Sequence, residues 1–257
     1  MAGRQAWDLG VEALTMCGRF NITADPLSQL LMAWVGLGHP GTDNFNLAPT
    51  ESVYVVRMDA DNTPEIVPMR WWLTPFWAKE LTTKYAMFNA KSETAHKSPA
   101  FKEPYRKRRC VVPVSGFYEW CRERGQKVPY FIKPAEHEGL LLAGLWDRWH
   151  NKEADEELLS FTILTTAAAE PMRMVHHRQP VMLSLAQASE WLDPEQQTGD
   201  LEHLFASLLP MSLEAVPVST HVNNARNKDE RCAQAIAPPV PLLGAQIQTG
   251  AEHEEKH

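Results

Sequence analysis

The strongest constraint on the fold is a series of strand-like segments that begins near residue 51 and runs past residue 160. Apolar and β-branched residues dominate these segments and turn-forming residues separate them, which is typical of strands rather than helices. SVYVVRM and EIVPMRWWL flank the turn-rich DADNT and predict a β-hairpin. RCVVPVSGFYEWC and KVPYFIKP, around the turn ERGQ, predict a second hairpin. GLLLAGLWDRW and ELLSFTILTT predict two further strands, the first buried on both faces.

Helices are predicted to be few. Asp25 as an N-cap and Pro26 at the first helical position predict a helix that ends near Gly36. Short helices are also predicted at 98–107, at 186–192 with Ser184 as a possible cap, and at 201–209, and LEAVPVST returns to strand. Because strands and helices do not alternate, we predict an α+β single domain. It would be a mainly antiparallel, barrel-like sheet with inserted and flanking short helices.

The composition is that of an ordinary globular protein, with 257 residues, 44% of them hydrophobic. No run reaches the roughly 18 apolar residues of a membrane span, and Asp8 and Glu12 interrupt the first segment, so we expect neither a membrane anchor nor a secretory signal. The four cysteines, at 17, 110, 121 and 232, form no C-x-x-C pair. We therefore expect reduced thiols in a bacterial cytoplasm and no zinc site.

The net charge of −7 argues mildly against a nucleic-acid partner. The charge is uneven, however, since KEPYRKRR at 102–109 is strongly basic while 152–157 and 252–255 are acidic. The basic run is compatible with a local basic groove and equally with a solvated helix end. We expect residues 1–15 to be a non-native or processed extension, 16–236 to be the folded domain, and the Pro-rich, then polar 237–257 to be a disordered tail.

Four short segments place a reactive or hydrogen-bonding residue beside a strand end or a tight turn. They are MCGRF (16–20), FNAKSET (88–94), SGFYEW (115–120) and VHHRQP (175–180). Each has an ordinary structural interpretation when taken alone, such as a buried cysteine, a turn asparagine or a solvent-facing glutamate. Since neighbours in an extended segment point in opposite directions, at most one of His176 and His177 is expected to face a site.

Taken together, these segments are similar to a known family. MCGRF, NLAPT (46–50), MRWWLTPFW (69–77), FNAKSET, CVVPVSGFYEW, VHHRQP and VSTHVNNARN (218–227) resemble, in order and spacing, the SOS response-associated peptidase (SRAP) family of abasic-site processing proteins. The resemblance runs from about Met16 to about Arg231, and seven motifs in order are a specific signal.

The resemblance implies the SRAP fold and a covalent, lyase-like reaction with DNA. In this family the N-terminal cysteine crosslinks to the ring-opened aldehyde of an abasic site in single-stranded DNA as a thiazolidine, which shields the site from strand cleavage during repair. Mapped onto this chain, Cys17 would be the nucleophile, Asn89 would orient it, Glu119 would be the acid/base and His176 would assist at the sugar. The resemblance implies no cofactor and no metal, and we expect a monomer.

A thiazolidine requires a free α-amine on Cys17, so the residues before Cys17 must be absent. Translation that starts at Met16, followed by removal of that methionine, would supply the amine. Self-cleavage before Cys17 would supply it equally well.

Candidate DNA contacts lie beside the proposed catalytic residues. Arg19, Lys91 and Arg178 are expected phosphate ligands, and Trp71 and Trp72 are expected to stack on bases, although strand alternation predicts that one of the two indoles is core. The chain departs from the family pattern at Lys91, which replaces an arginine and lacks its bidentate fork, at Gln179 in place of Met, and at Trp72 in place of glycine. A structural role is favoured for Asn223 and Asn224.

Two other functions remain open on the sequence. Cys17, His176 and Asn89 would also suit a cysteine peptidase or self-processing hydrolase, as nucleophile, base and orienting group. A non-catalytic single-strand DNA-binding module is the other alternative.

Overall fold

The strands form two sheets, one of six strands and one of eight, within the described residues. The computed structural model describes residues 18–81, 84–123, 125–136, 138–151 and 155–244. The six-stranded sheet has the order β14 (Val240–Leu242), β13 (Leu213–Pro217), β8 (Gln126–Pro134), β7 (Gly116–Glu123), β1 (Phe20–Ile22), β2 (Asn44–Leu47). The other has the order β11 (Arg178–Pro180), β10 (Glu156–Ala167), β4 (Pro64–Trp71), β3 (Ser52–Met58), β6 (Arg109–Val114), β9 (Leu140–Asn151), β12 (Met182–Leu183), with β5 (Asn89–Lys91) beside β10.

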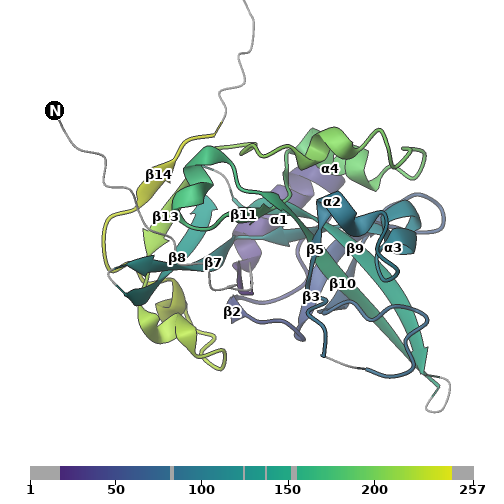
Figure 1. Cartoon of the computed structure of the whole chain (residues 1–257), viewed down its shortest axis with the longest axis horizontal. Coiled ribbons are helices and arrows are strands. Elements are labelled where there is room, and N and C mark those ends of the chain that lie inside the picture. The colour runs from purple at the N-terminus through teal and green to yellow at the C-terminus, as the bar shows by residue number, and fades with distance from the viewer. Residues whose placement is uncertain (1–17, 82–83, 124, 137, 152–154, 245–257) are drawn as a thin grey trace, which may run out of the picture.

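The second sheet closes on itself. Strand β10 pairs with β4 on one side and with β9 on the other, so β10, β4, β3, β6 and β9 form a closed five-stranded barrel. The pairing is antiparallel except where β10 runs parallel to β4 and β5. The predicted α+β domain with a mainly antiparallel, barrel-like sheet is confirmed, and Figure 1 shows the long β9 and β10 crossing the molecule.

Both predicted hairpins are present, with one difference. β3 and β4 pair from Ser52 opposite Arg70 to Met58 opposite Pro64, and β7 pairs with β8. The segment RCVVPVSGFYEWC was predicted as one arm, but it breaks at Ser115 into β6 and β7, which belong to different sheets. Ser115 is held there because its N–H donates to the Asn21 carbonyl and its Oγ accepts from the Thr23 N–H, both at 2.8 Å.

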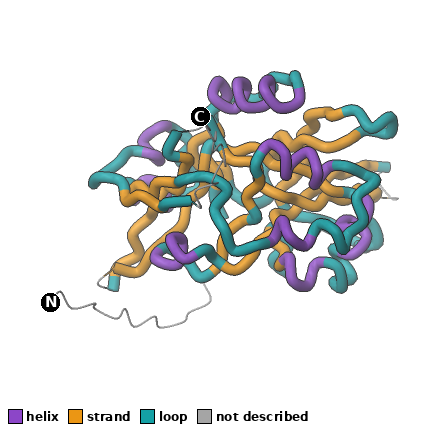
Figure 2. Tube along the Cα trace, turned by 90° about the horizontal axis from the view of Figure 1, so that it is seen from above, coloured by secondary structure: helices purple, strands orange, loops and turns teal. Residues whose placement is uncertain are grey.

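The helices are short and lie around the strands, as Figure 2 shows. α1 (Ala24–Val35) ends near Gly36, as predicted, and the left-handed φ of 72° at Gly36 closes its C-terminus. Its N-cap is Thr23 rather than the predicted Asp25. Ser184 caps α4 (Leu185–Leu192) in a capping box with Gln187. The other helices are α2 (Ser92–Ala95), α3 (Lys102–Lys107) and the 3₁₀ turns η1 (Glu170–Met174), η2 (Glu202–Phe205), η3 (Thr220–Asn223) and η4 (Glu230–Ala233). The predicted helix at 201–209 is therefore only the turn η2.

Three apolar clusters fill the spaces between these layers. The first occupies the barrel interior and the adjoining inner face of the six-stranded sheet, and includes Trp71, Phe161 and Phe117. The second lies between the barrel and helices α1 and α4. The third lies under residues 219–233 on the outer face of the six-stranded sheet, around Tyr118 and Val216. The two sheets thus share one continuous core.

Two further predictions concern the basic segment and the C-terminal tail. Arg109 is buried and donates to the carbonyls of Trp191 and Asp193, and Arg108 pairs with the buried Asp147, so both are structural. The predicted disordered tail from residue 237 is wrong at its start, because β14 pairs with β13 there. Residues 245–257 and the predicted extension 1–15 lie outside the described residues.

Candidate active site

The chain that follows Cys17 runs alongside the strand that carries Glu119. Phe20 pairs with Phe117 and Asn21 with Gly116, and the Tyr118 N–H donates to the Arg19 carbonyl at 3.0 Å. On the other side of β7, Gly116 permits close packing against β8, since a Cβ there would lie 2.4 Å from the Ile132 carbonyl oxygen. Cys17 itself lies outside the described residues.

Glu119 is buried, with 4% of its surface exposed. Phe117 and Cys121, two residues before and after it on β7, belong to the inner core, so period-two alternation puts Glu119 on the same inner face. The interpretation of Glu119 as a solvent-facing strand residue is therefore wrong. Tyr130 lies directly opposite on β8, and its hydroxyl donates to Glu123 at the end of β7.

Trp71 connects β1 to the segment that carries Asn89. Its indole stacks on Phe20 with centroids 3.9 Å apart, and its Nε1–H donates to the Phe88 carbonyl at 2.9 Å. Asn89 follows directly as the first residue of β5, opposite Ile163 of β10. Because Trp71 is 0% exposed, its predicted role in stacking on DNA bases is wrong, and it is the core member of the indole pair.

Trp72 is half-buried and packs against the inner core, with its ring tilted against Phe88 at 5.2 Å. Trp72 follows the last residue of β4, so strand alternation does not set its direction, and the two indoles differ in exposure rather than in the cluster they contact. The replacement of the usual family glycine is thus accommodated by packing on Phe88.

The residues directly before His176 contact the inner face of β7. The Cys121 thiol donates to the carbonyl of Val175 at 3.4 Å and to that of Met174 at 3.6 Å, immediately before His176. His176 is 7% exposed, and its Nδ1 accepts from the Arg178 N–H at 3.1 Å, which leaves the proton of a neutral ring on Nε2.

The two adjacent histidines do not point in opposite directions. Their rings stack with centroids 4.2 Å apart. The segment is turned rather than extended here, because the His176 N–H donates to the carbonyl of Met172, within η1. His176 is buried and His177 is exposed. The prediction that at most one of the two histidines faces inward therefore agrees with the fold, although the predicted reason for it does not.

The three predicted phosphate ligands differ in their surroundings. Lys91 is exposed at the end of β5. Arg178 forms a bidentate pair with Glu93, each arm at 2.9 Å, and also donates to the Thr165 carbonyl at 2.6 Å. The hydrogen bond from Arg178 holds the pKa of Glu93 below its usual value. Arg19 is half-buried, and its guanidinium points inward to Asn46.

Asn223 and Asn224 have the structural roles that the sequence favoured. The Asn223 Oδ1 accepts from the Trp120 Nε1–H at 2.7 Å, beside Glu119. Asn224 closes a turn by accepting from the Arg226 N–H. Gln179 is buried and bridges the Ala169 N–H and the Leu208 carbonyl, which gives the departure from Met a clear structural function.

The thiols of Cys110, Cys121 and Cys232 are free and buried. Burial is the main cause that raises the pKa of each of them, to about 12 for Cys121. A thiolate is the reactive form, so these three thiols are poor nucleophiles at neutral pH. Cys17 is the fourth cysteine of the sequence.

Within the described residues, His, Cys, Asp and Glu side chains do not gather in the groups of three that would hold a metal ion. Nor does any helix there have the length and apolar character needed to cross a membrane.

Three residues near the site were missed in the sequence. Asn46 contacts Arg19, Glu93 contacts Arg178, and Cys121 contacts the backbone before His176. Asn46 lies in the motif NLAPT and Glu93 in the motif FNAKSET, and Cys121 lies on the same face of β7 as Glu119. These positions, rather than the residue types, could have indicated that the three residues lie near the site.

Known proteins resemble this chain over most of its length. An abasic site processing protein of Bacillus subtilis, YoqW, is 33% identical over 82% of this chain and 96% of its own. The abasic site processing protein HMCES of Gallus gallus is 33% identical over 94% of this chain and 80% of its own.

Solved structures agree on the fold. A protein from Bacteroides thetaiotaomicron superposes with a TM-score of 0.72 at 22% identity, covering 86% of this chain and all of the other. One from Bordetella bronchiseptica superposes with a TM-score of 0.67 at 26% identity, covering 79% of this chain and all of the other. The sequence signature of one family, described as SOS response associated peptidase (SRAP), matches residues 16–225, and we conclude that the chain belongs to this family.

Proposed function

We propose that this protein processes abasic sites by crosslinking covalently to them in single-stranded DNA through Cys17. The observation that carries the proposal is that a chain of contacts links the segments holding Asn89, Glu119 and His176 to residues 19–21. These contacts are the Arg19–Tyr118 hydrogen bond, the Phe20–Trp71–Phe88 chain, and the Cys121–Val175 hydrogen bond. Cys17 lies two residues before Arg19, so its Cα is within about 7.6 Å of that of Arg19 whatever its conformation.

The proposed reaction joins the α-amine and the thiol of one residue to the same sugar carbon. The amine nitrogen of Cys17 bonds to C1′ of the ring-opened aldehyde, and the carbinolamine loses water to give an imine. The sulfur then bonds to the same carbon while the nitrogen takes a proton, and a five-membered thiazolidine forms. The net reaction releases one water molecule. Because both nucleophiles are on one residue, the second step is intramolecular and has a high effective concentration.

Ring closure protects the DNA strand. A persistent imine at C1′ acidifies C2′ and favours β-elimination, which breaks the strand. The thiazolidine removes the imine and so removes that route.

Glu119, Asn89 and His176 each have a role in the proposed reaction. Glu119 transfers the protons that dehydration of the carbinolamine requires, which a carboxyl group inside an apolar face is suited to do. Asn89 orients Cys17 from the start of β5. His176, with its Nδ1 occupied by the Arg178 N–H, directs Nε2 toward proton exchange with the sugar ring oxygen during opening.

Lys91 and Arg178 are the proposed phosphate ligands, and Trp72 is the proposed stacking side chain. Lys91 is exposed, and Arg178 would exchange its Glu93 partner for a phosphate. The exposed part of the half-buried Trp72 would stack on a base.

The experiment is a denaturing gel of labelled single-stranded DNA that carries one abasic site, incubated with protein that begins at Cys17. We expect a heat-stable adduct with the wild-type residue. Cys17→Ala retains an α-amine, so it should give an adduct only when borohydride traps the imine. DNA without the abasic site is the control.

Three outcomes would contradict the proposal. A Cys17→Ala variant that forms the stable adduct at the wild-type rate would exclude the thiol. DNA binding without any adduct would favour a non-catalytic binding module. Cysteine-dependent cleavage of peptides in place of an adduct would favour a hydrolase.

A further inference from the structure

Residues 219–233, which include η3 and η4, cover the outer face of the six-stranded sheet next to β7 and β2. We call this segment the strap. Val222 and Cys232 of the strap belong to the same apolar cluster as Tyr118 of β7. The strap also reaches the neighbour of Glu119, since the Asn223 Oδ1 accepts from the Trp120 indole at 2.7 Å.

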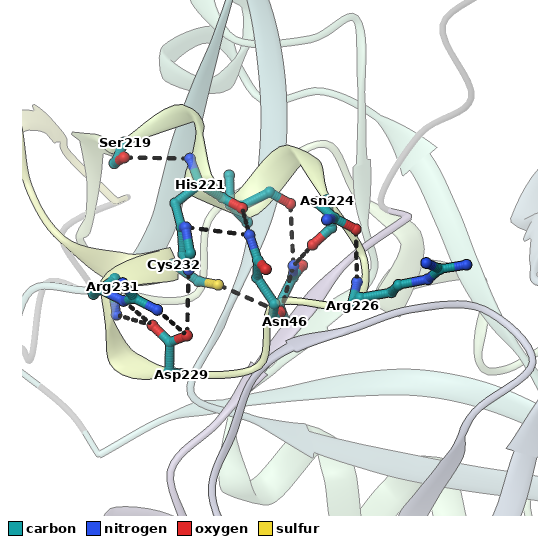
Figure 3. A network of polar contacts seen from close by, with 10 residues as sticks. Asn46, Ser219, His221, Asn224, Arg226, Asp229, Arg231 and Cys232 are labelled. Atoms are coloured by element: carbon teal, nitrogen blue, oxygen red, sulfur yellow. Dashed lines mark hydrogen bonds and ion pairs between the residues drawn. The ribbon is translucent and has the colours of Figure 1, made fainter.

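Asn46, on β2, forms hydrogen bonds to the strap, as Figure 3 shows. It also bonds to Arg19, which lies directly before β1. It is 0% exposed. Its Nδ2 donates to the strap carbonyls of Val222, Asn224 and Asn227 at 3.1, 3.0 and 2.9 Å. Its Oδ1 accepts from the Arg19 Nη1 at 2.8 Å. Both ends of this amide are therefore used, one on the strap and one on Arg19.

Further contacts fix the strap against β2. The Lys228 Nζ donates to the Asn46 carbonyl at 2.8 Å and to the Glu51 carboxylate at 2.6 and 2.7 Å. The Phe45 N–H donates to the Lys228 carbonyl at 3.1 Å. The carbonyls that Asn46 binds are thus held in place.

The guanidinium of Arg19 is directed into this network rather than toward solvent. Its Nη1 also donates to the Val222 carbonyl at 3.0 Å, and its Cζ lies 5.9 Å from the centroid of the Trp120 ring. Burial lowers the pKa of Arg19, while the nearby Glu51 raises it. The Arg19 guanidinium therefore binds groups within the fold, whereas the sequence predicted that it binds a DNA phosphate.

We propose that Asn46 and Arg19 are positioning residues for the crosslinking reaction, and that the strap is their fixed support. The Arg19 side chain is held by Asn46 and Val222, and its backbone carbonyl by the Tyr118 N–H. These contacts fix the chain two residues after Cys17 against the strand of Glu119. The inference rests on the proposed function, because it concerns the rate of that reaction.

The test separates positioning from phosphate binding. Asn46→Ala, Arg19→Ala and Arg19→Gln are compared with wild type at saturating abasic-site DNA. The affinity and its salt dependence are measured separately in a Cys17→Ala background. Arg19→Gln is informative because it removes the charge but keeps an amide donor. Arg148→Ala is the matched control, since Arg148 is an exposed arginine outside the strap that pairs with Glu157.

Asn46→Ala and Arg19→Ala should slow adduct formation about tenfold to a hundredfold, since a misplacement of about 1 Å costs a rate of that order. DNA affinity and the salt slope should stay unchanged. Arg19→Gln should recover part of the rate, and Arg148→Ala should react like wild type. Circular dichroism and thermal melting show whether each variant is folded. If Asn46→Ala does not fold, the adduct rates and salt slopes of the two Arg19 variants decide between positioning and phosphate binding.

Other results would overturn the inference. An unchanged rate in folded Asn46→Ala, or a salt slope that falls by about 0.7 in both Arg19 variants, as expected for one lost phosphate contact on a single strand, would exclude positioning. A wild-type protein that forms no adduct overturns the proposed function as well. A wild-type adduct with unchanged variant rates overturns the positioning role alone.

Discussion

Burial distinguishes Glu119 from Glu123 on the same strand. Glu119 is 4% exposed on the inner face of β7, whereas Glu123 is exposed near the strand end. Glu119 shares the inner face of β7 with Phe117 and Cys121 and lies opposite Tyr130 on β8. A carboxyl group on a buried face can transfer protons to a bound reactant without competition from bulk water, which is the role proposed for Glu119.

Glu119→Gln keeps the shape of this side chain but removes proton transfer. We expect adduct formation to slow by roughly a hundredfold, within the usual range for a general acid or base, while DNA affinity stays constant. Single-turnover gels with excess protein measure the rate. Glu156→Gln, at an exposed site on β10, is the control. Equal rates for Glu119→Gln and wild type would remove Glu119 from the mechanism.

Arg178→Ala should weaken binding to single-stranded DNA and lower its salt slope by about 0.7, the value for one phosphate contact. Fluorescence anisotropy at several salt concentrations measures both. Lys91→Ala should act similarly, because Lys91 is exposed at the end of β5, which pairs with β10 as β11 does. A salt slope that is unchanged in Arg178→Ala would assign that arginine to the fold alone.

At the scale of residues, the motifs gave candidate positions but not the directions of their side chains. The motif positions predicted Asn89, Glu119 and His176, and alternation predicted one core indole among Trp71 and Trp72. The stacking of His176 on His177 was not predictable, because it depends on the turn after η1. The inward use of Arg19 depends on Asn46 and Val222, which are distant in sequence.

At the scale of elements, one ion pair connects α2 to β11. Glu93 of α2 and Arg178 of β11 are bonded through both carboxylate oxygens, and β10 lies beside both elements through Thr165. The hydrogen bond from Arg178 lowers the pKa of Glu93, so the contact is favoured most when Glu93 is charged. Its stabilisation is present above the unfolded-state pKa of Glu93 and is lost as the pH falls through the lower folded-state pKa.

Acid should therefore loosen α2 from β11. We expect the amides of 92–95 and 178–180 to exchange hydrogen faster, relative to the rest of the chain, as the pH falls below the usual glutamate range. In Glu93→Gln this exchange should be fast already and should show little dependence on pH. Hydrogen exchange with mass spectrometry, corrected for intrinsic rates, measures this. Equal pH dependence in both proteins would show that the pair does not hold these elements together.

Most strands could be predicted from period-two patterns and turn residues, because both signals are local. The break at Ser115 could not, since it depends on hydrogen bonds to Asn21 and Thr23. β14 was missed because its sequence, VPL, is too short and too rich in proline to give a strand pattern without β13 beside it. The parallel pairing of β10 with β4 and β5 also lies beyond a local pattern.

At the scale of the whole molecule, the candidate site lies where the barrel meets the six-stranded sheet. Trp71 is central to that junction, because it stacks on Phe20 of one sheet and lies parallel to Phe161 of the other, 6.4 Å between centroids. The sequence predicted a barrel-like sheet, but not the sharing of one core by barrel and sheet, which follows from contacts between distant segments.

Replacement of Trp71 should therefore destabilise the whole fold. Trp71→Ala should lower the free energy of unfolding by about 3–5 kcal/mol, the usual range for a buried tryptophan. Trp77→Ala, at a side chain that is 55% exposed, should lower it by about 1 kcal/mol or less. Urea unfolding followed by circular dichroism measures both. A small effect of Trp71→Ala would contradict the shared core.

The most direct test of the proposed chemistry is the intact mass of the purified DNA adduct, with and without borohydride. We predict a mass equal to protein beginning at Cys17 plus abasic DNA, minus one water molecule, unchanged by borohydride because the thiazolidine has no imine to reduce. Peptide mapping should place the DNA on Cys17. An adduct that retains Ala2 through Thr15, that is reduced by borohydride, or that maps to a lysine would contradict the account.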